Sequence, residues 1–412
     1  MDTNFIVPKL REDIDIEFLK ENDGDYAILI DRYGYAPQPL AIQSAFLKVL
    51  DLIDGNLNFN ELLKSIKAHL KIDMKSQLLI EILKELNDRC FLESPNFYFS
   101  KYQLDYYKSI PIRPAVCEGL SYSPDTTELE LELENILSAV NKKEVRQNAN
   151  FIIVPHIDFS IGKISHEVYA PAYHSIRNTD ADLFVIFGTS HYGNSDLFML
   201  SEKDFQTPLG IAKTDKEILQ DLKDSLRENI TIDEIAHRFE HSIELQVVLL
   251  QYLFKDKDFT ILPVLTGPME TFLYKKLQPN KDNGFFNFIS SLNESILKRN
   301  KKPMFIASGD MAHIGRKFQD NFDAEPALTQ LKIEDGELIN HIINCDSEAL
   351  FNKIAENNDK RKICGLAPIY ALLESQKNEN EKNRHKGKLL NYNQWNEVET
   401  RSAVSFASIA FY

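Results

Sequence analysis

In KKPMFIASGDMAH (residues 301–313), a short apolar run ends abruptly in polar and ionisable residues. The same design recurs in NANFIIVPHID (148–158), ADLFVIFGTSHYG (181–193) and FTILPVLTG (259–267), and helical patterns cover 163–176, 214–228, 236–254 and 285–299. Short apolar runs that alternate with helices are typical of buried strands in an α/β fold. We therefore predict an α/β domain over residues 148–412, with helices on the faces of its sheet.

Three of the ten histidines stand where the predicted strands end: His156, His191 and His313. In open α/β sheets the ligand crevice lies outside the carboxyl ends of the strands. We therefore expect the three histidines to share one site. Asp158 and Asp310 follow the same strands, and either of them could bind a metal or orient a histidine.

A further pair of histidines lies in HRFEHSIE (237–244). His237 and His241 are four residues apart and would share one face of a helix. The pattern H-x-x-E-H is that of the inverzincins, in which two histidines bind zinc and the glutamate is the general base. The alternative interpretation is an ordinary helix start, with Glu240 near the positive end of the helix dipole.

The residue types favour a metal site. Neutral imidazoles suit iron, copper, zinc or nickel, and two or three histidines with a carboxylate leave positions open for water, O₂ or substrate. Without a metal, the same histidines could form an acid/base pair. The chain has no GxSxG, P-loop or GxGxxG motif, which argues against a serine hydrolase and a dinucleotide-binding enzyme.

Residues 1–115 predict a separate small domain. A strand-like run, AILIDR (27–32), precedes apolar positions at helical spacing over 42–53, a turn at 54–56, and two helices from Asn58 and over 78–86. We expect residues 91–92 and 97–99 to form a strand pair, which gives a winged-helix-like module. Residues 46–66 resemble the PqqD-like peptide-binding modules through Asp54, Gly55, Glu61 and Leu62. The alternative is a plain helical appendage.

The intervening residues 116–147 are predicted to connect the two domains. They contain TELELELENI (127–136), whose strong helix formers favour a helix with a solvated acidic face.

Composition excludes several classes of protein. The 412 residues carry a formal net charge of −15, and no basic patch typical of nucleic-acid binding is visible. No apolar run reaches the 18–20 or so residues of a membrane span, and the N-terminus lacks the pattern of a signal peptide. The four cysteines are far apart, which argues against a disulfide scaffold. We therefore expect a cytoplasmic protein that binds neither nucleic acid nor membranes.

From about residue 148 onward the sequence resembles the Memo family, also called protein B of the AmmeMemoRadiSam system. The resemblance rests on an ordered series of motifs: VPHID, GTSHYG, TPLG (207–210), EHSIELQ (240–246), ILPVLTG, SGDMAH, ICGLAPIYALL (363–373) and VSFASIAFY (404–412). It implies a fold similar to that of the LigB-type class III extradiol dioxygenases, which use non-haem iron.

The resemblance also implies roles for individual residues. His156 and His191 fall at the metal-ligand histidines, with His313 as the third ligand, while His241 and Asp310 fall at catalytic positions. Some family members carry a metal-binding cysteine just before the last histidine, and this chain has Ala312 there. We therefore expect a metal shell without a thiolate. Cys364, in the ICG motif, is interpreted as packing at a strand-to-helix turn.

The function implied is metal-dependent redox or dioxygenase-like chemistry on a small molecule or a peptide. Iron is the first choice of metal, copper and zinc are alternatives, and a metal-free site stays open. The N-terminal module would recruit a peptide or a radical SAM protein. Two alternatives remain: a non-catalytic binding or scaffold protein with a degenerate site, and a zinc hydrolase that uses His237, Glu240 and His241.

Overall fold

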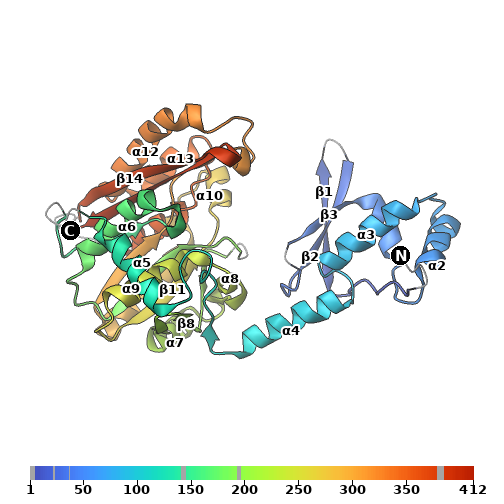
Figure 1. Cartoon of the computed structure of the whole chain (residues 1–412), viewed down its shortest axis with the longest axis horizontal. Helices are drawn as coiled ribbons and strands as arrows, with labels where there is room; N and C mark the ends of the chain where they lie inside the picture. The colour runs from blue at the N-terminus through green and yellow to red at the C-terminus, as the bar shows by residue number, and fades with distance from the viewer. Residues whose placement is uncertain (1–4, 22–23, 37, 141–144, 193–195, 378–384) are drawn as a thin grey trace. The chain divides into compact units, whose positions relative to one another are not determined.

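A computed structural model describes residues 5–21, 24–36, 38–140, 145–192, 196–377 and 385–412 (Figure 1). The chain divides into two compact units, residues 1–110 and 111–412, here called unit 1 and unit 2. The described part of 116–147, which we expected to connect two domains, belongs to unit 2. Its helix α5 (Thr126–Ser138) buries Leu129, Leu133 and Ile136 in that unit's core, and the charged side chains between them face outward.

Unit 1 is a three-stranded antiparallel sheet followed by helices. The strands are β1 (Ile14–Glu21), β2 (Gly24–Asp31) and β3 (Leu40–Gln43), in the order β1-β2-β3. The helices are α1 (Leu47–Leu50), α2 (Phe59–Ser65), α3 (Ser76–Asp88) and α4 (Pro95–Ser109). Leu29 of the sheet and Val49, Leu62 and Leu79 of the helices are fully buried, so the sheet and the helices share one core.

Part of the prediction for unit 1 is wrong. Ile42, predicted to begin a helix, lies in β3. Phe97–Phe99, predicted as a strand, lies in α4, because Ser94-Pro95 begins a helix with proline in its first turn. The helix predicted from Asn58 is confirmed. The Asn58 side chain accepts from the Glu61 N–H, and the Glu61 side chain in return accepts from the Asn58 N–H.

A buried ion pair ties the N-terminal segment to the sheet of unit 1. Both terminal nitrogens of Arg11 donate to the Asp31 carboxylate at 3.0 Å, and both side chains are almost fully buried. Burial alone would raise the pKa of Asp31, but hydrogen bonds from Arg11 and from the Ala36 and Tyr33 N–H groups outweigh it and hold that pKa below its usual value.

This pair makes unit 1 sensitive to acid. A carboxyl whose pKa is depressed on folding stabilises the fold above its unfolded pKa near 3.9, and the stabilisation is lost as the pH falls through the folded value. Below about pH 4 we expect peptides of β2 to lose hydrogen-exchange protection progressively, with a weaker pH response in Asp31→Asn. An unchanged response in that variant would contradict this account.

Unit 2 is built on a mixed sheet whose centre is parallel. Strands β5 (Phe151–Val154), β12 (Pro303–Ser308), β6 (Leu183–Thr189) and β11 (Thr260–Thr266) lie side by side and run parallel. The C-terminal strand β15 (Ser402–Phe411) pairs antiparallel with β5, and with both β13 (His313–Gly315) and β14 (Gly387–Glu397). Shorter strands extend the other edge: β7 (Phe198–Leu200), β8 (Asp204–Thr207), β9 (Gly210–Thr214), β4 (Ile112–Arg113) and β10 (Thr231–Ile232).

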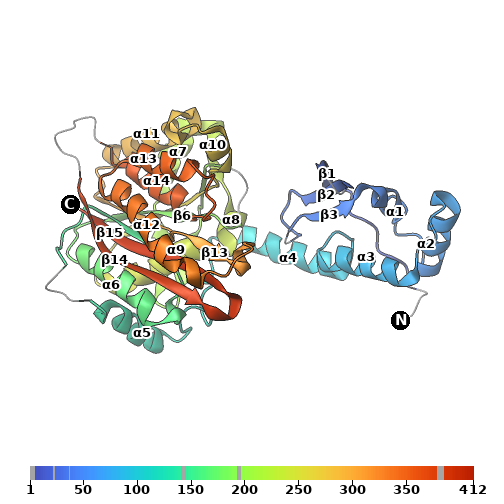
Figure 2. The same cartoon turned by 90° about the horizontal axis from the view of Figure 1, so that it is seen from above.

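Helices cover both faces of this sheet, as predicted for an α/β fold (Figure 2). Side chains alternate along β5, so that Phe151 and Ile153 join one core and Ile152 and Val154 join the other. One face packs against α5, α6 (Lys163–Ile176) and α9 (His241–Leu253). The opposite face packs against α7 (Lys216–Leu226), α11 (Asn283–Lys298), α12 (Leu328–Ile343), α13 (Ser347–Ala355) and α14 (Leu366–Ser375).

Three further findings concern the predicted elements. The helix predicted over 236–254 is two helices, because α8 (Glu234–Arg238) ends before α9 begins at His241. The predicted polar loop at 375–388 falls largely on residues 378–384, outside the described residues. Among the described helices, α10 (Glu270–Lys275) included, we find none with the length and apolar character needed to span a membrane.

Candidate functional site

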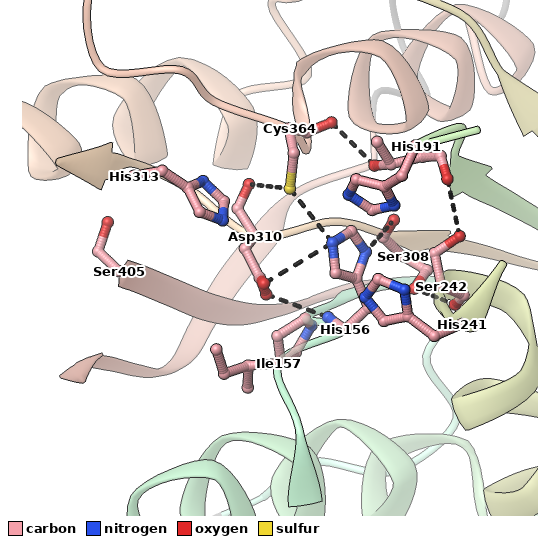
Figure 3. Close-up of polar contacts among 12 residues, drawn as sticks. His156, Ile157, His191, His241, Ser242, Ser308, Asp310, His313, Cys364 and Ser405 are labelled. Carbon is pink, nitrogen blue, oxygen red and sulfur yellow. Dashed lines mark hydrogen bonds and ion pairs between the residues drawn. The ribbon is translucent and has the colours of Figure 1, made fainter. Parts of the chain in front are cut away.

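A cleft of about 830 Å³ opens at the carboxyl ends of the central strands of unit 2. His156 follows β5 by two residues, His191 follows β6 by two, and Asp310 follows β12 by two. Because these strands are parallel neighbours, their ends deliver the three side chains to one place, as Figure 3 shows. The remaining histidines of the cleft, His241 and His313, come from the start of α9 and from β13.

His156, His191 and His241 form a compact trio. Their ring centroids lie 5.1, 5.0 and 4.9 Å apart in pairs. The Nδ1 atom of His156 lies 3.2 Å from the Ser308 carbonyl oxygen, to which it donates. That bond leaves its Nε2 atom directed into the cleft. Burial lowers the pKa of His156 well below its usual value, with the neighbouring histidines adding to the effect, so this imidazole is neutral at pH 7.

Glu240 organises the other two histidines. Its carboxylate lies 3.0 Å from the Nδ1 atom of His191 and 3.2 Å from that of His241, and it accepts the His191 backbone N–H at 2.8 Å. It also caps α9 by accepting the Ser242 N–H at 2.9 Å. Burial alone would raise the pKa of Glu240, but the two imidazoles outweigh it and hold that pKa well below its usual value. The interpretation of Glu240 as a helix start is thus confirmed, although the residue is 1% exposed rather than solvent-facing.

The pKa of His241 is shifted in the opposite direction to that of His156. Burial disfavours its cation, yet the hydrogen bond and the charge of Glu240 outweigh this cost and raise the pKa of His241. The trio therefore combines an imidazole whose pKa is lowered with one whose pKa is raised.

Cys364 lies in the cleft, and its interpretation as a packing residue alone is wrong. Its Sγ atom is 3.2 Å from the Nε2 atom of His156, and one ligand atom each of His156, His191 and Cys364 lie within 4.8 Å of one another. The turn is also tight, because a Cβ on Gly365 would meet the Asp310 carbonyl oxygen at 2.5 Å. Ala312 led us to expect a metal shell without a thiolate, but Cys364 brings a thiol into the cleft from another strand-to-helix turn.

Asp310 and His313 sit beside the trio. Asp310 accepts the backbone N–H of His156 at 3.1 Å, and burial raises its pKa to about 7. His313 lies on the far side of Cys364 from His191 (Figure 3), and its Nδ1 atom is 3.0 Å from the Lys362 carbonyl oxygen. His313 groups with Asp310 and Cys364 rather than with His156 and His191. Burial lowers its pKa to about 4.

Two other candidates, His237 and Asp158, are held by contacts outside the histidine trio. The Nε2 atom of His237 lies 3.0 Å from the Met199 carbonyl oxygen, and the residue joins none of the potential metal groups among the described residues. The break between α8 and α9 removes the shared helix face on which the H-x-x-E-H interpretation depends, so a zinc site that pairs His237 with His241 is not formed. Asp158 caps a short turn through the Ser160 N–H and accepts from Ser121.

Sequence reasoning missed the buried network behind the trio. The Arg113 guanidinium donates to the carbonyl oxygens of His237 and Glu240, both at 2.6 Å, and forms an ion pair with Glu244. Glu244 also accepts from Tyr122 at 2.6 Å and from the backbone N–H groups of Val116 and Cys117. Arg113 and Glu244 are both fully buried. The sequence feature that could have revealed this network is Glu244. It is a charged residue among the apolar residues of α9, and such a residue requires a buried partner.

Comparisons with known proteins identify the family of the chain. A family model described as Memo-like protein matches residues 113–410, which is most of the chain. The chain belongs to the Memo-like family. The match begins at Arg113, so the buried network and the cleft both lie within the Memo-like region.

Relatives of this Memo-like chain differ in length. A MEMO1 family protein of Aquifex aeolicus is 28% identical and covers 94% of this chain and 96% of its own length, so the similarity extends into unit 1. A MEMO1 family protein of Methanosarcina barkeri is 30% identical and covers 72% of this chain and 98% of its own. A solved structure of an uncharacterised protein from Escherichia coli K12 covers 64% of this chain and 99% of its own, at 14% identity and a TM-score of 0.35.

The Arg113–Glu244 pair should be needed for the stability of unit 2. Arg113→Met or Glu244→Gln leaves one group buried without its charged partner, which costs about 3–5 kcal/mol of unfolding free energy. The double variant should recover part of this loss. Urea denaturation followed by the fluorescence of Trp395, the single tryptophan, measures both effects.

Lys163→Ala, which breaks an exposed pair with Glu167, is the control and should cost less than about 1 kcal/mol. Single variants of Arg113 and Glu244 that are as stable as this control would contradict the assignment.

Proposed function

We propose that this protein is a metal-dependent enzyme with redox or dioxygenase-like activity, and that His156, His191 and Cys364 hold the metal. Iron is the first choice, with copper and zinc as alternatives. The observation that carries the proposal is the orientation of the ligands. His156 and His191 each direct Nδ1 to an oxygen acceptor, which leaves Nε2 for a common ion near the Cys364 sulfur.

The donor set is chemically suited to such an ion. Two imidazoles and a thiolate favour iron, copper or zinc over magnesium or calcium, which prefer oxygen. Burial keeps His156 neutral, the form that binds metals. Without an ion, burial raises the pKa of the Cys364 thiol well above its usual value. A cation beside the sulfur would favour the thiolate and release its proton.

The remaining side chains of the cleft are suited to acid/base work. A bound iron or copper ion would supply the redox centre. His241, whose proton is held by Glu240, is placed to give or take a proton within the cleft. Asp310, with a pKa of about 7, is suited to exchange a second one. Groups that titrate near neutral pH are the most effective general acids and bases.

Metal analysis of the purified protein tests the ligand set. We expect His156→Ala, His191→Ala and Cys364→Ser to lose most of the metal retained by the wild type, because each removes one donor of three. His313→Asn is the matched control in the same cleft and should retain the metal. Equal metal content in the wild type and the three ligand variants would contradict the proposal, and loss in His313→Asn alone would move the site to Asp310 and His313.

Oxygen uptake with catechol as a probe, measured on iron-loaded protein, tests the activity. We expect uptake by the wild type and at least about a hundredfold less by His241→Asn, because general acid/base catalysis contributes 10² or more. The variant should retain its iron, which separates the acid/base role from metal binding. If metal-loaded wild type consumes no oxygen with any catechol, a non-catalytic binding protein becomes the better account.

We further propose that unit 1 recruits a peptide or a radical SAM protein in the cytoplasm. Support comes from an apolar groove of about 310 Å³ in unit 1, lined among others by Phe5, Val7, Phe59, Ile80 and Leu83. The similarity to the Aquifex aeolicus relative extends into unit 1, so at least one relative shares sequence with this unit. Ile80→Asp should abolish co-elution of the full chain with a radical SAM protein of the same organism, and Glu81→Gln on the same helix should not. Equal co-elution of both variants would contradict this use of the groove.

A further inference from the structure

One end of the cleft combines lysines with aromatic rings. Lys317, Phe318, Lys362 and Trp395 all line the cleft and are here called the lysine–aromatic end. The Phe318 ring and the Lys362 carbonyl oxygen both contact His313. The four residues come from a short turn after β13, the loop before α14, and β14. The metal proposal uses none of them.

The rings and the Lys317 ammonium form one wall. The Nζ atom of Lys317 lies 5.7 Å from the centroid of the Trp395 ring and 6.0 Å from that of the Phe318 ring. The ring of His313 packs edge-on against Phe318, with centroids 5.0 Å apart. A planar group could therefore stack in this part of the cleft and meet a positive charge at its edge.

Both lysines of this end form ion pairs with acidic residues. Lys317 is paired with Glu397 at 3.0 Å, and Lys362 is paired with Asp320 at 2.7 Å. Neither acid lines the cleft, whereas both lysines do. The two lysine side chains are 47% and 41% exposed, and each ammonium has three donors. The lining of the cleft at this end therefore contains two lysines and neither of their acidic partners.

Two acids also line the cleft, Asp158 and Asp310. Asp158 accepts from Ser121, and Asp310 accepts the His156 backbone N–H and lies near His313. Lys317 and Lys362 are the lysines that line the cleft, and they would attract a negatively charged ligand.

We propose that the lysine–aromatic end binds a planar, negatively charged group of the substrate, of the class of an aromatic carboxylate. The charged edge of the group faces Lys317 and Lys362, and the ring lies against Trp395 and Phe318. The rest of the substrate then extends toward His156 and His191. This inference rests on the proposed function, because it assigns the substrate class of the same cleft.

Binding of 4-fluorobenzoate to the full-length protein tests the inference, with 4-fluorobenzamide as the neutral analogue of the same shape. Titration followed by ¹⁹F NMR gives both dissociation constants, and quenching of Trp395 fluorescence locates the ligand. We expect the carboxylate to bind about three- to tenfold more tightly than the amide, as the gain of one partly exposed charge contact allows.

Variants separate charge recognition from structure. Lys317→Gln should weaken 4-fluorobenzoate about three- to tenfold and leave 4-fluorobenzamide unchanged. Glu397→Gln breaks the same ion pair but keeps the lysine, so it should not weaken the carboxylate. Lys163→Gln, which removes an exposed lysine outside the cleft, should change neither constant.

Three results would overturn the inference: equal binding of carboxylate and amide, no quenching of Trp395, or equal weakening by Lys317→Gln and Glu397→Gln. The last result would show that the ion pair acts on structure alone. These measurements use no metal, so a negative result would not contradict the metal proposal. If the metal proposal were contradicted, the binding measurements could still be interpreted.

Discussion

The site depends on one buried carboxylate. Glu240 stands at the gap between α8 and α9, caps α9, and fixes the rings of His191 and His241 through their Nδ1 atoms. A single charge thus caps the start of one helix and orients two functional side chains. Its position is in turn set by Arg113, which binds the Glu240 carbonyl oxygen while its own charge is compensated by Glu244. The geometry of the cleft therefore follows from a chain of buried charges that must all be paired.

The central fold could be predicted from the sequence because its signals are local. Four apolar runs that each end in polar residues fix the parallel strands, and the rule for open sheets brings His156, His191 and Asp310 to one edge. Unit 1 was harder to predict. The exposed strand β1 carries charges between its apolar residues, and the apolar positions of 42–53 fit a strand followed by a short helix as well as they fit one helix.

The details of the site could not be predicted because they depend on contacts between distant segments. His237 and His241 seemed to share a helix face, and only the break at Glu240 separates them. Cys364 and His156 are 208 positions apart, and their contact arises where the turn before α14 meets the end of β5. The sequence motif located Cys364 but led us to assign it to packing. The close approach of Gly365 to Asp310 does reflect packing, but it does not determine which way the Cys364 thiol points.

X-ray absorption of the zinc-loaded protein would identify the atoms that bind the metal. The account predicts one sulfur ligand at about 2.3 Å together with imidazole nitrogens at about 2.0–2.1 Å, and loss of the sulfur shell in Cys364→Ser. A first shell of nitrogen and oxygen alone in the wild type would contradict the assignment of His156, His191 and Cys364 as the metal ligands.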